Sequence, residues 1–257
     1  MPDPERSGGW MFVVDGVEQS YVDTRRPRYL YHVYVRHIAS IIDTVARRGA
    51  PLRVLHLGGG ALTVPRYVAA TRPGSVQWVV ERDAALDAYI RKRLPLPPGS
   101  GIRTVTADAR DAVEAMDVAM DERFDLVIND VYDGATMPGN VASVEFAELV
   151  TRVLEPAGTY VVNVTDGPPS LHSRLQAATL RVVFPDVWAI GEVGMFRGRK
   201  YGNVVFAAGR SMPPVRLARL VRMAERDEAR VRVVAGPVLD RFIGPAQPRR
   251  DVRASRS

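Results

Sequence analysis

The sequence predicts an α/β fold in which a Rossmann-like, doubly wound parallel sheet follows a small N-terminal β-hairpin region. Two observations predict it. From Leu52 onward, short apolar strands alternate with amphipathic helices, as in a parallel sheet covered by helices on both faces. The first of these strands ends in Gly58, Gly59 and Gly60, a strand-to-helix turn typical of such domains. With 257 residues, 46% of them hydrophobic, the chain can bury a core of this kind.

The elements before Leu52 are a predicted hairpin and a predicted helix. Residues 10–23 contain two strand-like runs around Asp15-Gly16, a dipeptide that favours a tight β-turn. Apolar residues between Leu30 and Val45 recur at three- and four-residue spacing, which predicts an amphipathic helix that Gly49 ends.

The alternating elements follow in order. We expect strands at residues 52–57, 75–81, 102–107, 124–129 and 159–164, with a helix ending at residue 71 and others at 84–94, 109–120, 144–154 and 171–183. Residues 187–192 and 203–208 are expected to form a closing antiparallel pair, and an amphipathic helix follows around Leu220. We therefore divide the chain into a hairpin region (1–28), a Rossmann-like domain (29–211), and a C-terminal helix with a disordered basic tail (212–257).

Composition excludes several kinds of chemistry. The chain contains no cysteine, which rules out disulfides, thiolate metal sites, iron–sulfur clusters and cysteine nucleophiles. Its four histidines are scattered, so we expect no metal site. Residues 1–9 lack the apolar run of a signal peptide, and no stretch approaches the roughly 20 apolar residues of a membrane span. We therefore expect a cytoplasmic protein with no membrane partner.

The net charge of +6 is unevenly distributed along the chain. Residues 245–257 carry four arginines against one aspartate, which accounts for half of the excess. The rest of the chain is close to balanced, so we expect no nucleic-acid partner.

Three features of the sequence follow three consecutive predicted strands. The glycines at 58–60 end the first strand, Glu81 ends the second, and Asp108 follows the third. Because the carboxyl ends of parallel strands meet at one edge of a sheet, these residues can share a cavity. Glycines let a ligand approach the backbone, and an acidic residue about 20 positions later can bind ribose hydroxyls. Asp108 can accept a hydrogen bond from an adenine amino group. The sequence therefore predicts a nucleoside site.

Plainer explanations exist for each of these features. Glycine runs also form ordinary turns, and acidic residues commonly cap helices. No glycine follows Gly60 at the spacing that seats a pyrophosphate, which argues against a full dinucleotide site.

Asp130 and Asp133 leave the fourth predicted strand at the same edge. Two carboxylates facing one cavity suit a cationic substrate, and one of them can take a proton from an ammonium that then acts as a nucleophile. The alternative is a turn, because Asp133-Gly134 and Pro138-Gly139 are turn formers.

Four motifs in this order resemble the spermidine synthase (polyamine aminopropyltransferase) family over about residues 10–208. They are VVDGVEQ, YLYHVYVRH, VLHLGGG with VVERD, and FDLVINDVYD ahead of Met137-Pro138. The resemblance implies a methyltransferase-type Rossmann-like domain that often forms dimers, so we expect a homodimer. It also implies transfer of an aminopropyl group from decarboxylated S-adenosylmethionine to a di- or polyamine, with methylthioadenosine as the by-product and no metal.

The resemblance further implies a role for individual residues. Asp130 would be the catalytic proton acceptor, Asp133 a second anchor for the attacking amine, and His32 a neighbour of the polyamine. The expected nucleoside-binding residues, with Glu81 on the ribose and Pro138 near the adenine, are Gln19, Gly58, Gly59, Gly60, Glu81, Asp108, Ala109 and Pro138.

The sequence departs from the family pattern in three places. Ala61 stands where the family has an aspartate that contacts the amine of the donor, and Val33 stands where it has a glutamate. After Asp133 the chain reads GATMP instead of PVGP. Loss of two carboxylates would weaken polyamine binding by about tenfold to thousandfold.

These departures leave two alternatives to aminopropyl transfer. One is an S-adenosylmethionine-dependent methyltransferase on an unknown acceptor, because an apolar wall at Ala61 would not repel the carboxylate of that donor. The other is a non-catalytic protein with the same fold that binds a nucleoside.

The remaining polar and aromatic residues have a structural interpretation, and for some of them a functional one stays open. His37 lies on the apolar side of the first predicted helix and His56 lies inside a strand, so we expect both in the core. Residues 197–200, which include Lys200, predict a solvated loop or a lid. Aromatic residues at the start of the first helix either line the cavity or pack in the core: Tyr29, Tyr31 and Tyr34.

Overall fold

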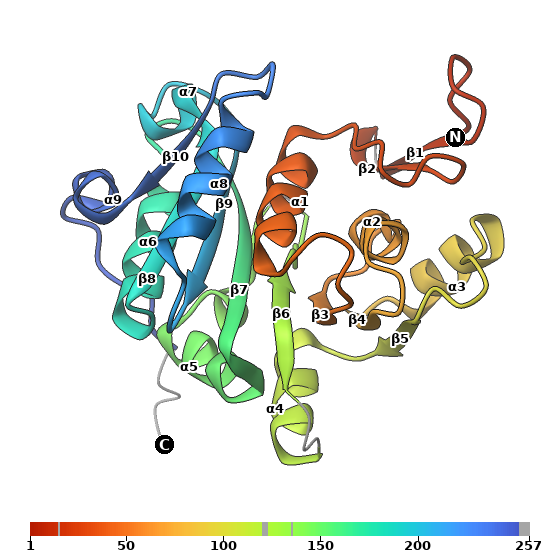
Figure 1. Ribbon diagram of the computed structural model, residues 1–257, viewed down its shortest axis with the longest axis horizontal. Helices are drawn as coiled ribbons and strands as arrows, with labels where there is room; N and C mark the ends of the chain where they lie inside the picture. Colours follow the sequence, from red (N-terminus) through yellow and green to blue (C-terminus); the bar gives the residue numbers. More distant parts are fainter. Residues whose placement is uncertain (15, 120–122, 135, 252–257) are drawn as a thin grey trace.

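An eight-stranded mixed sheet forms the centre of the protein, and helices cover both of its faces (Figure 1). The computed structural model describes residues 1–14, 16–119, 123–134 and 136–251. Its strand order is β10-β8-β9-β7-β6-β3-β4-β5. The strands are β3 (Arg53–Leu57), β4 (Val76–Glu81), β5 (Ile102–Thr106), β6 (Phe124–Asn129), β7 (Leu154–Asp166), β8 (Asp186–Glu192), β9 (Gly202–Gly209) and β10 (Val231–Ala235). The predicted Rossmann-like α/β fold is confirmed.

The parallel half of the sheet contains the point where the strand order reverses. From β3 the chain adds β4 and β5 on one side, and then returns to add β6 and β7 on the other, all in parallel pairs. The carboxyl ends of β3 and β6 therefore lie side by side, which is where doubly wound sheets bind ligands. Beyond β7, the strands β9, β8 and β10 pair antiparallel, and β8–β9 is the closing pair predicted from the sequence.

Helices form two apolar layers against the sheet. The helices are α1 (Val33–Val45), α2 (Thr63–Thr71), α3 (Ala84–Arg93), α4 (Ala109–Ala119), α5 (Val144–Val153), α6 (Leu171–Val183), α7 (Val193–Phe196), α8 (Pro214–Ala224) and α9 (Gly236–Ile243), with a 3₁₀ turn η1 (Gly139–Val141). Apolar residues of α1, α2 and α8 pack on one face, and those of α4, α5, α6 and α9 pack on the other. None of the described helices has the length and apolar character needed to span a membrane.

A hairpin of β1 (Gly9–Val14) and β2 (Val17–Asp23) lies outside the main sheet (Figure 1). The two strands pair antiparallel, as predicted, while Asp15 of the predicted turn lies outside the described residues. Val22 and Leu62 belong to one apolar cluster, and the Thr63 hydroxyl donates to the Tyr21 carbonyl oxygen at 2.9 Å. These contacts fix the end of β2 above the glycine turn.

The C-terminal segment differs from the prediction of one helix and a disordered tail. After α8 the chain forms β10, which extends the sheet beside β8, and then α9. Residues 245–251 are ordered because their polar groups have partners: the Arg249 amide donates to Thr179 Oγ1 at 2.8 Å, and Asp251 Oδ2 accepts from Arg110 at 2.7 Å. The expectation of disorder was therefore wrong for 245–251, and residues 252–257 lie outside the described part of the chain.

Candidate active site

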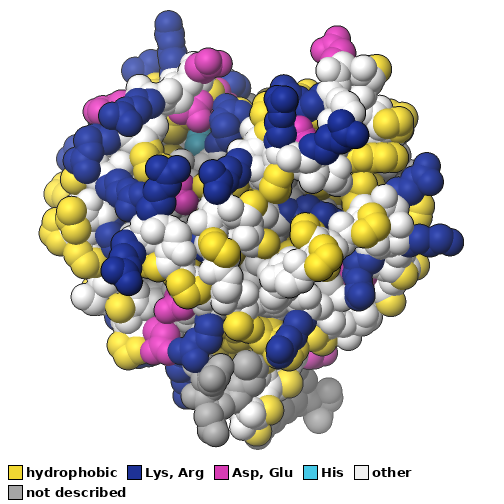
Figure 2. All heavy atoms as spheres, turned by 45° about the vertical axis from the view of Figure 1, so that its right-hand side comes forward, with side chains coloured by type: hydrophobic (Ala, Val, Ile, Leu, Met, Phe, Trp, Pro, Cys, Tyr) yellow, Lys and Arg dark blue, Asp and Glu magenta, His cyan; other side chains and the backbone are white. Residues whose placement is uncertain are grey.

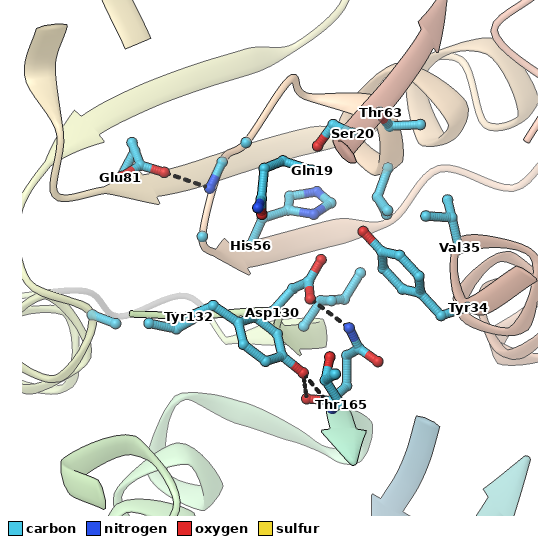
Figure 3. A pocket seen from close by; sticks show the side chains of 18 of the residues that line it. Gln19, Ser20, Tyr34, Val35, His56, Thr63, Glu81, Asp130, Tyr132 and Thr165 are labelled. Atoms are coloured by element: carbon cyan, nitrogen blue, oxygen red, sulfur yellow. Dashed lines mark hydrogen bonds between the residues drawn. The ribbon is translucent and has the colours of Figure 1, made fainter. Parts of the chain in front are cut away.

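A cavity of about 1040 Å³ opens at the carboxyl edge of the sheet, where β3, β4 and β6 end (Figure 3). Residues of β2 and the start of α1 close its other side. Every residue singled out above as a site residue lines this cavity: Gln19, His32, Gly58, Gly59, Gly60, Glu81, Asp108, Ala109, Asp130, Asp133 and Pro138. The roles assigned to them stay predictions.

The glycine turn after β3 is shaped by two close approaches. Gly58 has φ +91°, and a Cβ atom there would lie 2.5 Å from the Asp130 carbonyl oxygen. Gly59 donates its amide to Glu81 Oε2 at 3.0 Å, and a Cβ on Gly59 would lie 3.3 Å from that same oxygen. Glycine at both positions brings the ends of β3, β4 and β6 together.

Glu81 is held in place from both sides. In addition to the Gly59 bond, its Oε1 accepts from the Asp83 amide at 3.0 Å. A carboxylate oxygen can accept more than one hydrogen bond, so both oxygens retain capacity for ligand hydroxyls. Figure 3 shows Glu81 beside the glycine turn, which is the geometry expected for a ribose-binding carboxylate.

Asp108 caps a helix in addition to lining the cavity. Its Oδ1 accepts from the Arg110 amide at 2.8 Å and from the Asp111 amide at 3.5 Å, at the N-terminus of α4. Capping is thus a structural role that Asp108 fills whether or not it contacts a ligand.

Asp130 lies at the floor of the cavity, at the end of β6. Its Oδ1 accepts a hydrogen bond from Asn163 Nδ2 at 2.8 Å. Burial raises the pKa of the Asp130 carboxyl, and the Asn163 bond opposes this effect in part. A carboxylate with a raised pKa is a better proton acceptor than an exposed one.

Two tyrosines border Asp130, and Figure 3 shows the Tyr34 hydroxyl pointing toward it. Burial raises the pKa of both Tyr34 and Tyr132, and the charge of Asp130 adds to the effect. Tyr132 donates to the Asn163 carbonyl oxygen at 2.9 Å and accepts from the Thr165 amide at 2.7 Å. Both hydroxyls therefore stay protonated and neutral at physiological pH.

Asp133 occupies the rim of the cavity. It forms an ion pair with Arg82 at 3.0 Å, and its side chain is 68% exposed. An exposed pair of this kind contributes little energy, so a cationic ligand could displace Arg82 at small cost.

His32 presents an unpartnered nitrogen near the start of α1. Its Nε2 is buried and has no hydrogen-bond partner among the described residues. Burial lowers the pKa of His32, partly offset by the charge of Glu18. The ring stacks on Tyr34, with the two centroids 5.8 Å apart.

The cavity is acidic although the chain is basic. Figure 2 shows Lys and Arg side chains spread over one face of the surface. Among the described residues that line the cavity, Arg82 is the one side chain with a permanent positive charge. The carboxylates that line it are Glu18, Glu81, Asp83, Asp108, Asp130, Asp133 and Glu192. Such a cavity favours cationic ligands.

The chain is similar in sequence to curated polyamine aminopropyltransferases. No family model matches the chain. A polyamine aminopropyltransferase of Vibrio vulnificus (strain CMCP6) is 24% identical over 156 residues, covering 61% of this chain and 51% of the relative. One from Synechococcus sp. (strain JA-2-3B'a(2-13)) is 29% identical over 184 residues, covering 68% and 56%. The chain spans about half the length of the curated relatives it matches.

One solved structure is similar to this chain over its whole length. The crystal structure of a probable spermidine synthase from Corynebacterium glutamicum ATCC 13032 superposes with a TM-score of 0.90 and 28% identity, covering 100% of this chain and 94% of that one. The chain is a divergent spermidine synthase-like protein. Human methyltransferase-like protein 13, solved in complex with SAH, has a TM-score of 0.61 at 18% identity, covering 75% of this chain and 90% of that one, which shows a shared fold.

Of the two positions at which the sequence lacks a carboxylate of the spermidine synthase pattern, Val33 lines the cavity and Ala61 does not. Val33 lines the cavity, so a carboxylate is missing from its wall. Ala61 is 2% exposed and packs in the apolar cluster of Val22, Leu62 and Val79. It is not among the lining residues, so the apolar wall expected at Ala61 was wrong.

Sequence reasoning missed the residues that β7, β8 and β9 contribute to this cavity. Asn163 Oδ1 accepts from Asn203 Nδ2 at 3.1 Å, and Asn203 also donates to Thr165 Oγ1 at 2.9 Å. Glu192, at the end of β8, lines the cavity as well. A signal for Asn163 was present, because a lone asparagine in the apolar run VVNV is buried and needs partners.

The two histidines expected in the core are both 2% exposed, as predicted. His56 Nε2 lies 2.9 Å from Gln77 Oε1, and burial lowers the pKa of His56 to about 4. His37 differs, because both of its buried ring nitrogens lack a partner among the described residues. Both histidines also line the cavity. In the described part of the chain, no cluster of His, Asp and Glu is arranged to hold a metal ion.

Proposed function

We propose that this protein is an aminopropyltransferase that moves an aminopropyl group from decarboxylated S-adenosylmethionine to a di- or polyamine. The observation that carries the proposal is the acidic cavity, with Asp130 at its floor beside a glycine turn and Glu81. Carboxylates attract both the positively charged donor and the positively charged acceptor.

The donor is proposed to bind at the glycine turn. Glu81 would accept hydrogen bonds from the ribose hydroxyls, and Asp108 with Ala109 and Pro138 would border the adenine. Gln19, on β2, would close the site over the donor. The solved spermidine synthase in complex with the transition state analogue AdoDATO has the same fold, with a TM-score of 0.59 at 17% identity over 85% of this chain and 73% of that one.

The chemistry is a direct displacement. An alkylammonium has a pKa of about 10, so the acceptor must lose a proton before it can attack. Asp130 takes that proton, and the freed amine nitrogen forms a bond to the methylene carbon next to the sulfonium. The C–S bond breaks, its electron pair stays on sulfur, and methylthioadenosine leaves as a neutral thioether. Asp130 and Glu81 contribute position and charge.

The same electrostatics disfavour methyl transfer. S-adenosylmethionine carries a carboxylate that the decarboxylated donor lacks. Two like charges 4 Å apart repel by about 1 to 4 kcal/mol near a protein surface. A cavity whose charged groups are carboxylates, apart from Arg82, therefore favours the decarboxylated donor.

Calorimetric titration with methylthioadenosine, S-adenosylmethionine and decarboxylated S-adenosylmethionine tests the proposal. We expect the decarboxylated donor to bind at least tenfold more tightly than S-adenosylmethionine. The reverse preference would favour methyl transfer on another acceptor. No binding of any of the three would leave a protein with the fold and without the activity. A homodimer and a cytoplasmic location remain predictions, and light scattering of the purified protein tests the former.

A further inference from the structure

One of the carboxylates that line the cavity comes from the antiparallel half of the sheet. Glu192 is the last residue of β8, and its side chain is 22% exposed. Neighbouring lining residues come from the start of β9: a Cβ atom on Gly202 would lie 4.0 Å from Glu192 Oε1, and Asn203 follows Gly202. Asn203 donates to Asn163, and Asn163 donates to Asp130, so a chain of hydrogen bonds runs from the start of β9, near Glu192, to Asp130.

A lysine ammonium binds Glu192. Lys200 Nζ donates to Glu192 Oε2 from the loop that follows α7. The loop is closed by a hydrogen bond of 3.0 Å from the Arg199 amide to the Gly194 carbonyl oxygen, and the Lys200 side chain packs on Gly194. Lys200 is one of two lysines in the chain. Its side chain ends in a primary alkylammonium, the same group that ends a diamine.

His37 provides an independent sign that a polar ligand belongs at this end of the cavity. It is 2% exposed and lines the cavity, and neither ring nitrogen has a partner among the described residues. Burial lowers the pKa of His37 to about 4, although the negative charges of Asp227 and Glu192 oppose this effect. An unpaired buried nitrogen is costly, and a neutral imidazole can accept a hydrogen bond from an ammonium.

From these observations we propose that Glu192 binds the distal ammonium of the acceptor, with Lys200 occupying this subsite until the acceptor arrives and His37 available as a further acceptor of hydrogen bonds. The inference rests on the proposed function and narrows it. With Asp130 at the reacting end and Glu192 at the far end, the site selects a molecule with two ammonium groups over a monoamine. Glu192 would thereby replace the carboxylate lost at Val33.

Calorimetry with 1,4-diaminobutane and 1-aminobutane, in the presence of saturating methylthioadenosine, tests the subsite. We expect Glu192→Gln to weaken binding of the diamine about tenfold and binding of the monoamine less than twofold. We expect Lys200→Met to tighten binding of the diamine at least threefold, because it removes the competing ammonium. Lys92→Met is the matched control, since it removes the other lysine, which is exposed on α3 outside the cavity.

Two results would overturn the subsite. One is that Glu192→Gln weakens both amines equally. The other is that Lys200→Met and Lys92→Met change the affinity for the diamine to the same extent. Turnover of the unmodified protein with decarboxylated S-adenosylmethionine separates this inference from the proposed function. Turnover with an unchanged diamine KM in Glu192→Gln refutes the subsite alone. Glu192-dependent diamine binding without turnover refutes the transfer activity and supports the subsite.

Discussion

Asn163 donates a hydrogen bond of 2.8 Å to the carboxylate of Asp130, from a strand that lies beside it in the sheet and 33 residues away in the chain. This bond favours the charged carboxylate, whereas burial disfavours it. The balance of the two determines the pH range in which Asp130 can accept a proton.

Replacing Asn163 with alanine removes this bond. Because the charged form of Asp130 then loses a stabilising partner, its pKa rises, and the acidic limb of the kcat/KM profile should move upward by about one pH unit. Asn203→Ala is the matched control, since Asn203 bonds to Asn163 and not to Asp130. An acidic limb at the same pH in both variants would show that Asn163 does not tune Asp130.

Asp130→Asn should stabilise the protein while strongly lowering its activity. The folded state binds the Asp130 proton more tightly than the unfolded chain does, so Asp130 costs stability as the pH rises above the ordinary carboxyl range. We expect the Tm at pH 8 to rise by about 2 °C. The gain should shrink as the pH falls toward 4, whereas a gain equal at both values would contradict the raised pKa. Turnover should fall at least about 100-fold, measured as release of methylthioadenosine.

Gly58→Ala should disrupt the site more than its backbone strain alone predicts. The added Cβ atom would lie 2.5 Å from the Asp130 carbonyl oxygen, at a φ of +91°. Gly99 has a φ of +70°, and a Cβ atom added there would meet no other atom within 4 Å. Gly99→Ala is therefore a control that measures the backbone strain of a positive φ alone, about 1 kcal/mol. Urea unfolding should show a larger loss for Gly58→Ala by at least about 1 kcal/mol. Equal losses of unfolding free energy in the two variants would mean that the glycine turn after β3 shifts enough to accommodate the added Cβ atom.

Asp251→Asn should weaken nucleoside binding indirectly, because Asp251 positions Arg110. Arg110 holds Asp251 with two bonds, at 2.7 and 3.1 Å, and also donates to the carbonyl oxygen of Asn140 at 2.9 Å. Since Asn140 lines the cavity and Arg110 lies next to Ala109, we expect methylthioadenosine to bind about threefold to tenfold more weakly. Arg250→Gln removes an exposed ion pair with Glu145 and serves as the control. If Asp251→Asn binds methylthioadenosine as tightly as the unmodified protein, residues 245–251 contribute to stability and not to nucleoside binding.

The sequence predicted the site residues that lie at the carboxyl ends of the parallel strands, because strand and turn patterns along the chain locate these ends. Gly58–Gly60, Glu81, Asp108 and Asp130 each lie at or just after the end of a strand in the parallel run, and parallel strands place their carboxyl ends at one edge. Glu192 and Asn203 escaped prediction because they come from antiparallel strands, whose order in the sheet no local pattern reveals. The strand β10 was missed because its short run VRVVA becomes a strand only by pairing with β8.

Mass spectrometry of a reaction with decarboxylated S-adenosylmethionine and 1,4-diaminobutane is the most direct test of aminopropyl transfer. We expect methylthioadenosine and the diamine carrying one added aminopropyl group to form in equal amounts, and both to form at least about 100-fold more slowly with Asp130→Asn. Formation of a methylated product from S-adenosylmethionine, or no product from either donor, would contradict the proposed function.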